Sequence, residues 1–220
     1  MKKITAVVPV RKGSVRVKNK NMKPFANSSL LEIKIKQLQS VPDLDKIVVS
    51  SDCEEMIDLA WSLGVEIHER QEYYASSAAT NSEFFKNLAQ ELVESDCIMY
   101  SPVTCPLISR ETYVECIRMF QSKGVTSLAT AAPVKHHMWL DGSPLNYTLE
   151  NSPNSQDLPD IYKITYGICI LDRADMIKHS NVVVPGVTFK VVDEIEAVDI
   201  DTEFDFLVAE HIYKKLYLGD

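Results

Sequence analysis

The fold of this chain is decided by residues 4–23, which read ITAVVPVRKGSVRVKNKNMK. Residues 4–10 are apolar and rich in β-branched side chains, a pattern that predicts a buried strand. Residues 11–23 carry six cations and no acid. Backbone N–H groups and cations that follow a buried strand attract anions, so this basic loop favours a phosphate ligand. The alternative is a solvated loop without a ligand, as charge runs usually are.

Apolar segments alternate with helical patterns along the rest of the chain. The predicted strands are residues 46–50, 65–68, 97–101, 126–132, 166–172 and 197–200. The predicted helices are residues 29–39, 54–63, 82–93, 110–121 and 202–217, with Ser28 or Ser29 capping the first and Ser109 capping the fourth. Strands that are apolar on both faces and separated by helices predict an α/β fold, doubly wound around a mostly parallel, Rossmann-like sheet. Ligands are expected at the carboxyl ends of its strands.

Residues 133–165 depart from this alternation, because proline, asparagine and serine interrupt the apolar pattern there. A projecting loop, flap or antiparallel excursion is predicted for this segment, within a single domain formed by residues 1–220. We find no internal repeat and no second core in the sequence.

Composition narrows the possible functions. The net charge is −8, so non-specific binding to nucleic acid is not expected. No stretch approaches the ~20 apolar residues of a membrane span, and the first ten residues are too short for a signal peptide. The five cysteines form no CxxC pair and suit reduced thiols, which indicates a cytoplasmic protein.

A second charged segment balances the basic loop. Residues 193–205 carry seven acids and no cation. If residues 197–200 form a strand that continues to Asp201, the carboxylates of Asp199 and Asp201 point to the same side, while Ile200 enters the core. Magnesium commonly binds one or two protein carboxylates together with phosphate oxygens and water. The alternative is that Asp201 caps the following helix, but the basic loop makes a Mg²⁺ site with Asp199 and Asp201 the better prediction.

The adjacent histidines His136 and His137 would face opposite sides of a strand and are therefore poor joint ligands of zinc. One of them could contact a substrate, and a histidine without a role in a loop is the equal alternative.

Taken together, these motifs resemble those of the CMP-sugar-acid synthetases, the acylneuraminate and 3-deoxy-manno-octulosonate cytidylyltransferases. The resemblance begins with Arg11-Lys12-Gly13-Ser14 and Lys20-Asn21 and continues through residues 49–52, 64–66 and Arg70. It resumes at residues 104–107, at His136-His137 and at residues 199–202, so that it spans nearly the whole chain in order.

The resemblance implies transfer of CMP from CTP to an acidic sugar, with release of pyrophosphate and with Mg²⁺ as cofactor. It implies that catalysis rests on Arg11, Lys20, Asp199 and Asp201. Nucleotide contacts are implied for Arg11, Lys12, Gly13, Ser14, Lys20, Asn21, Arg70, Ser76 and Ser77, and acceptor contacts for Thr104, His136, His137 and Lys163. Relatives are commonly dimers in which a segment like 133–165 reaches the neighbouring subunit, so a homodimer is expected.

Three departures from the family pattern concern mainly the acceptor side. Gln71 replaces a proline of the family, and residues 75–77 replace an Ala-x-Asp motif. Pro102 stands where sialate enzymes carry glutamine. Of an Arg-Pro-Asn-Gly motif, only Gly167 remains. These departures favour an acceptor other than ordinary sialic acid: a different nonulosonate, another sugar acid or a phosphonate. Two alternatives remain open: a non-catalytic nucleotide-binding relative, and a nucleotidyltransferase that uses UTP or GTP.

Overall fold

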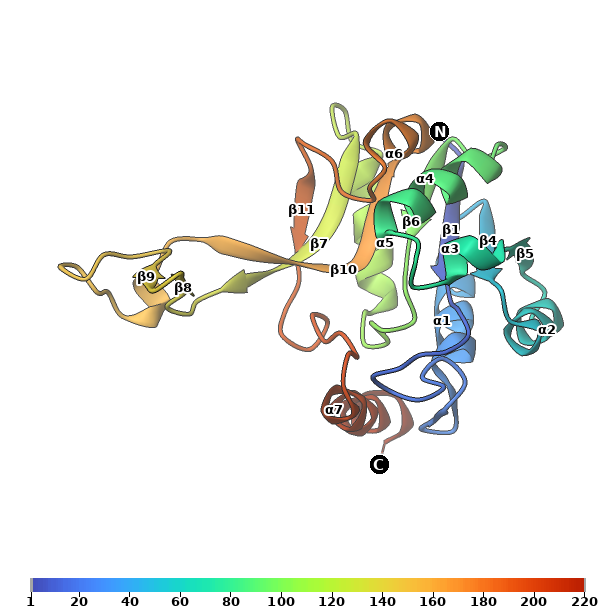
Figure 1. Cartoon of the computed structure of the whole chain (residues 1–220), viewed down its shortest axis with the longest axis horizontal. Helices are drawn as coiled ribbons and strands as arrows, with labels where there is room; N and C mark the ends of the chain where they lie inside the picture. Colours follow the sequence, from blue (N-terminus) through green and yellow to red (C-terminus); the bar gives the residue numbers. More distant parts are fainter. Residues whose placement is uncertain (1, 220) are drawn as a thin grey trace.

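The computed structural model describes residues 2–219 and contains a seven-stranded sheet in the order β11-β7-β10-β6-β1-β4-β5 (Figure 1). The parallel part consists of β1 (Ile4–Pro9), β4 (Lys46–Ser51), β5 (Glu66–Glu69) and β6 (Cys97–Tyr100). The remaining strands are β7 (Ser127–Val134), β10 (Ile161–Asp172) and β11 (Thr188–Val191), of which β10 runs antiparallel to both of its neighbours. The predicted α/β architecture with a mostly parallel sheet is confirmed.

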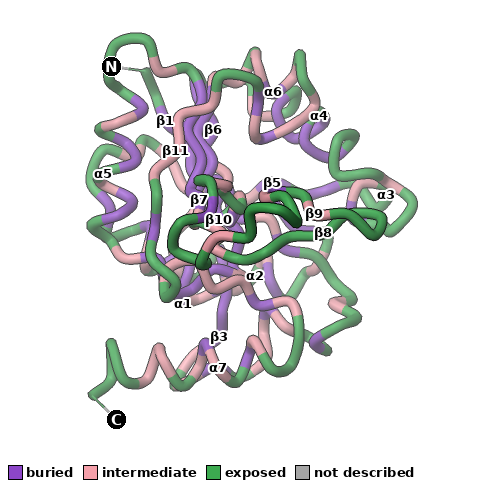
Figure 2. Tube along the Cα trace, turned by 90° about the vertical axis from the view of Figure 1, so that its left-hand side faces the viewer, coloured by how far each residue is buried: buried purple, intermediate pink, exposed green. Residues whose placement is uncertain are grey.

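Helices cover both faces of this sheet. They are α1 (Leu30–Gln39), α2 (Glu54–Ser62), α3 (Glu72–Ala75), α4 (Asn81–Glu91), α5 (Arg110–Phe120), α6 (Arg173–His179) and α7 (Glu203–Tyr213), which continues as a π-helical turn at Lys214–Leu218. Strand β1 shows the period of two directly, because Ile4, Ala6 and Val8 pack in one core cluster with α1 and α5, while Val7 packs in the other with α4 and α6. The buried strands run through the middle of the molecule (Figure 2).

Helix caps fix where several helices begin. The Ser29 hydroxyl accepts a hydrogen bond from the Glu32 N–H, and Ser109 accepts one from the Thr112 N–H. Both predicted caps are therefore confirmed, with Ser29 rather than Ser28 capping the first helix. Helix α7 begins with a capping box between Thr202 and Asp205. The side chain of Asp201 is accordingly not the cap of this helix.

The predicted strand at residues 197–200 is wrong. Residues 194–197 form a turn, and residues 198–200 have no regular structure. The segment runs along the loop after β6, where the Ile200 N–H donates to the Thr104 carbonyl at 2.9 Å. Ile200 is fully buried, whereas Asp199 and Asp201 are partly exposed, so the expected alternation in burial occurs without a strand. The sequence also missed strand β11 and helices α3 and α6.

An arm projects from the body between β7 and β10 (Figure 1). Both strands extend beyond the sheet as an antiparallel pair, with Ile161 opposite Val134 and Tyr162 opposite Pro133. The arm also contains the short pair β8 (Trp139–Leu140) and β9 (Ser143–Pro144) and a 3₁₀ turn at Ser155–Asp157. The remaining strand pair, β2 (Pro24–Phe25) and β3 (Ser28–Ser29), precedes α1.

No helix among residues 2–219 combines the length and the apolar character that crossing a membrane would require.

Candidate active site

A cleft of about 810 Å³ opens at the carboxyl ends of β1, β5 and β6. The loop after β1, the segment between β5 and α4, the loop after β6 and the approach to α7 form its walls. Ten of the residues singled out in the sequence line it: Arg11, Ser14, Lys20, Asn21, Arg70, Ser76, Ser77, Thr104, Asp199 and Asp201. The basic loop and the acidic segment thus meet in one site, although about 180 residues separate them.

The basic loop holds its shape through backbone turns and buried anchors. Arg11 Nη1 donates to the Ala75 carbonyl at 2.8 Å, and Asn21 Nδ2 donates to the Arg11 carbonyl at 3.1 Å. Gly13 adopts a φ of 81°, a left-handed conformation that glycine adopts without strain. Val17, at 1 % exposure, anchors the middle of the loop in the core. Gly13 and Lys12 lie beside the cleft, outside the residues that line it.

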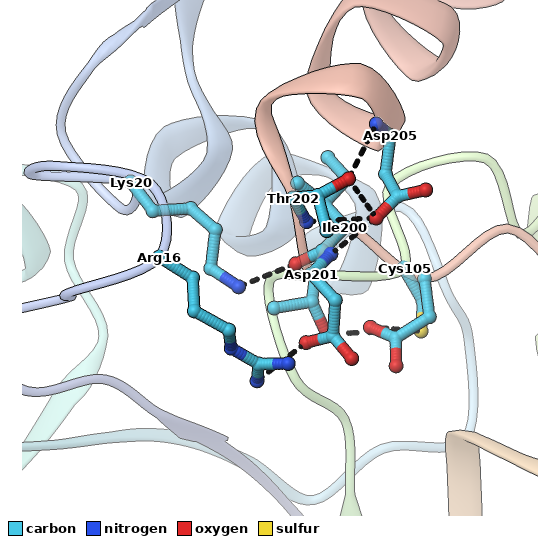
Figure 3. A network of polar contacts seen from close by, with 9 residues as sticks. Arg16, Lys20, Cys105, Ile200, Asp201, Thr202 and Asp205 are labelled. Carbon is cyan, nitrogen blue, oxygen red and sulfur yellow. Dashed lines mark hydrogen bonds and ion pairs between the residues drawn. The ribbon is translucent and has the colours of Figure 1, made fainter.

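Three cations of the loop contact the acidic segment directly: Lys23, whose Nζ lies 2.6 Å from Glu203 Oε2, and the two drawn in Figure 3. Arg16 Nη2 lies 2.7 Å from Asp201 Oδ1, and Lys20 Nζ donates to the Ile200 carbonyl. Burial lowers the pKa of Lys20, and the charges of Asp201 and Asp199 oppose that effect. These contacts hold the loop against the start of α7.

Asp199 is the more buried of the two carboxylates. Burial raises its pKa, and the charge of Asp201 acts in the same direction, while a hydrogen bond from Thr104 and the charges of Lys20 and Lys163 act against it. A cation bound between the two carboxylates would relieve their mutual repulsion. Residues 2–219 contain no group of three or more side chains placed to hold a metal.

Arg70 forms another wall of the cleft and is 7 % exposed. Its Nη2 donates to the Ser50 carbonyl at 2.7 Å, and its guanidinium carbon lies 4.2 Å from the centre of the Phe84 ring. Burial lowers its pKa to about 10, which leaves the side chain cationic at neutral pH.

The structure places the other predicted acceptor residues outside the cleft of their own chain. His136 and His137 are exposed on the arm, where His137 Nε2 lies 3.0 Å from the Pro153 carbonyl and its ring packs against Tyr147. Lys163 is exposed on β10, near enough to Asp199 for its charge to affect that carboxyl.

Sequence reasoning missed several residues of the cleft, among them Arg16, Tyr74, Tyr100, Tyr166 and Asn181. Arg16 lies within the quoted basic loop, so its charge was a usable signal. Asn181 follows α6 in a segment without a motif, and only the fold brings it to the site. Tyr166 has a φ of 56°, at the irregularity of β10 before Gly167. A Cβ at Gly167 would lie 2.3 Å from Ile108 Cδ1, which explains the glycine at this position.

A basic loop after β1 faces two carboxylates at the carboxyl edge of a mostly parallel sheet, an arrangement that suits a nucleoside phosphate. The family model described as "Cytidylyltransferase" matches residues 5–152. The chain therefore belongs to the cytidylyltransferase family, and the resemblance to its CMP-sugar-acid synthetases is confirmed.

Among curated proteins, the chain is 25% identical to post-translational flagellin modification protein B of Campylobacter coli, covering 98% of this chain and 97% of that protein. It is 24% identical to CMP-N,N'-diacetyllegionaminic acid synthase of Campylobacter jejuni, covering 96% of this chain and 95% of that protein.

Solved structures share the fold. CMP:2-keto-3-deoxy-manno-octonic acid synthetase complexed with CTP aligns with a TM-score of 0.70 at 10% identity, over 97% of this chain and 99% of that one. The 4-diphosphocytidyl-2C-methyl-D-erythritol synthase of Anaerococcus prevotii aligns with a TM-score of 0.72 at 15% identity, over 97% and 96%.

Proposed function

We propose that this enzyme transfers CMP from CTP to a nonulosonate-type sugar acid and releases pyrophosphate. The observation that carries the proposal is the meeting of the basic loop with Asp199 and Asp201 in one cleft. The names of the curated relatives, which include CMP-N,N'-diacetyllegionaminic acid synthase and pseudaminic acid cytidylyltransferase, support an acidic nine-carbon sugar as the acceptor. They favour an enzyme over the non-catalytic alternative.

The triphosphate of CTP would lie along the basic loop. Arg11, Ser14, Lys20 and Asn21 all line the cleft there and supply cationic and neutral hydrogen-bond donors. Lys12 and Gly13 shape the loop beside them, while Arg70, Ser76 and Ser77 flank the nucleotide. Phosphoryl-type transfer requires positioning and charge neutralisation more than covalent chemistry, and this set of donors suits that requirement.

Asp199 and Asp201 fit a Mg²⁺ ion. Both offer carboxylate oxygens to the cleft, and burial, with the charge of Asp201 acting in the same direction, raises the pKa of Asp199, so a cation bound there would favour its charged form. Magnesium commonly binds one or two protein carboxylates, and phosphate oxygens and water supply its other ligands. When bound, magnesium would neutralise charge on the phosphates and on the departing pyrophosphate.

The acceptor oxygen would attack the α-phosphorus of CTP, forming the new P–O bond as the bond to pyrophosphate breaks. Pyrophosphate would leave along Arg11 and Lys20, whose charges stabilise it. Thr104 lies in the cleft and Lys163 near it, so both could orient the acceptor.

His136 and His137 would serve a neighbouring copy in a homodimer, because the arm carries them away from their own cleft. Exposed apolar side chains on the arm, including Trp139 at 53%, Leu140 at 60% and Leu145 at 55% exposure, support burial against that copy.

Pyrophosphate release tests this function. The purified chain would be incubated with CTP, Mg²⁺ and, separately, N-acetylneuraminate, a pseudaminate, a legionaminate, 3-deoxy-manno-octulosonate or a phosphonate. We expect turnover with at least one nonulosonate and formation of its CMP conjugate. Lys20→Ala should lower turnover strongly, whereas Lys18→Ala, an exposed cation of the same loop, serves as the matched control. Turnover with the phosphonate alone would replace the proposed acceptor, and turnover with none of them would contradict the proposal.

A further inference from the structure

A row of polar side chains, buried except at Glu91, joins the end of α4 to Arg70 in the cleft. His68 Nε2 lies 2.5 Å from Glu91 Oε2, and His68 Nδ1 lies 2.9 Å from Ser50 Oγ. Arg70 Nε in turn donates to Ser50 Oγ at 3.1 Å. Four side chains from β4, β5, the loop after β5 and the end of α4 are thus joined in one row.

Burial makes these contacts energetically important. Ser50 is fully buried, and His68 and Arg70 are 9% and 7% exposed, so each unsatisfied polar atom would carry a desolvation cost. Glu91 is itself fixed, because Asn87 Nδ2 donates to it at 2.8 Å and Gln71 Nε2 at 3.1 Å. The Glu91 carboxylate, at one end of the row, is therefore held in place.

The donors and acceptors of the row define a direction. Arg70 can only donate, so Ser50 Oγ accepts a hydrogen bond from it. The buried Ser50 hydroxyl then donates its own hydrogen to His68 Nδ1. A neutral imidazole that accepts at Nδ1 carries its hydrogen on Nε2, where it donates to the Glu91 carboxylate. Every member is then satisfied, in the order Arg70, Ser50, His68, Glu91.

We propose that His68 is a positioning residue, which acts through Ser50 to hold the Arg70 guanidinium in place for the nucleotide. This inference rests on the proposed function of the cleft. Arg70 Nε and Nη2 both bind Ser50, through its hydroxyl and its carbonyl, and the Phe84 ring packs against the guanidinium. Fixing a long arginine side chain in advance removes part of the entropy cost of binding an anion.

The test is CTP binding by calorimetry, with thermal unfolding measured for each variant. His68→Phe removes both ring nitrogens and should raise the Kd for CTP about fivefold, as the loss of one buried hydrogen bond predicts. His68→Gln keeps a donor and an acceptor and should retain most of the affinity. Glu69→Gln, at an exposed position next to His68 on β5, is the matched control. If His68→Phe does not fold, Ser50→Ala and Glu91→Ala interrupt the same row.

A double-mutant cycle separates positioning from a general structural effect. In an Arg70→Ala background, His68→Phe should cause little further loss of CTP affinity, because its partner is already gone. Additive losses, or unchanged affinity in a stably folded His68→Phe variant, would overturn the inference. A different failure, Arg70→Ala binding CTP as tightly as the unaltered chain, would contradict the nucleotide role of Arg70 itself.

The direction of the hydrogen bonds at His68 can be measured separately from the affinity for CTP. Nitrogen-15 NMR of the neutral His68 ring should show hydrogen on Nε2 and none on Nδ1, with CTP absent. Hydrogen on Nδ1 would mean that Ser50 Oγ accepts from both Arg70 and His68, and it would overturn the inference, whatever the affinity for CTP.

Discussion

Arg16 and Asp201 form an ion pair in the cleft, with Arg16 Nη2 2.7 Å from Asp201 Oδ1 (Figure 3). The guanidinium occupies one side of a carboxylate that we propose as a ligand of magnesium. A divalent cation and Arg16 therefore compete for Asp201, and the phosphates of CTP offer Arg16 another anionic partner once the cation binds. Binding of the metal and movement of the basic loop are expected to be coupled through this contact.

Arg16→Ala should accordingly tighten binding of Mn²⁺, a spectroscopic substitute for magnesium, when CTP is absent. We expect a change of about twofold to fivefold, since exposed ion pairs contribute at most roughly 1 kcal/mol. The measurement is Mn²⁺ titration followed by electron paramagnetic resonance, with Lys18→Ala as the control for lost charge in the same loop. Weaker Mn²⁺ binding by Arg16→Ala would show that the two cations do not compete.

Asp199→Asn and Asp201→Asn should each lower kcat by about 100-fold or more, because each removes a charged oxygen ligand from the proposed metal site. Melting temperatures should change little, since Thr202 and Asp205 form the cap of α7 without the Asp201 side chain. Thr202→Ala is the contrasting variant: it should cost about 1 kcal/mol of stability through loss of the cap. Unfolding of Asp201→Asn would instead assign that residue a structural role.

Lys34 leads to a prediction about pH and stability. Its side chain is fully buried in α1, where Nζ contacts the Cys105 carbonyl at 2.9 Å and Gln37 Oε1 at 2.7 Å. Burial lowers its pKa to about 7, from 10.5 for an unburied lysine. Between those values the unfolded chain binds a proton that the folded chain lacks, so this residue makes the free energy of unfolding rise with pH.

Below about pH 7 both states bind the proton and this slope disappears. Lys34→Met has no such proton, so the unfolding free energy of the unaltered chain minus that of the variant should increase by about 2 kcal/mol from pH 7 to pH 9. Urea denaturation at several pH values measures this difference, in which other titrating groups largely cancel. A difference that stays constant with pH would mean that Lys34 titrates alike in both states.

The arm gives a prediction about assembly. Replacing Trp139 and Leu140 together by serine should shift the chain from dimer to monomer in sedimentation velocity, because both side chains are exposed and would lie against the second copy. Trp61→Ser is the matched control, since Trp61 is 76% exposed on α2 in the body of the molecule. A monomer without any substitution, or a dimer that persists in the double variant, would remove the arm from the interface.

Local sequence patterns were enough to predict the strand and the helix starts around the site. The period of two in residues 4–10 places Val7 and Val8 on opposite faces of β1, and Ser29 and Ser109 cap helices where a hydroxyl precedes an amphipathic pattern. The charges of the basic loop and the acidic segment indicated that they meet. These features depend on short-range sequence, so one chain is enough to detect them.

Other features depend on contacts between distant segments. Residues 197–200 have the composition of a strand, yet they pack along the loop after β6, where the Thr104 carbonyl accepts from the Ile200 N–H. Strand β11 lies at the sheet edge, has only four residues and buries none of them fully, so it gives a weak signal. The row from Glu91 to Arg70 joins positions from separate elements, and no local spacing reveals it.

Calorimetric titration of CTP, with and without Mg²⁺ and beside ATP, GTP and UTP, tests the central claim most directly. The account predicts magnesium-dependent binding that favours CTP, weakened by Lys20→Ala and unchanged by Lys18→Ala. Equal binding of all four nucleotides, a preference for one of the other three, or no binding in the presence of magnesium would contradict it.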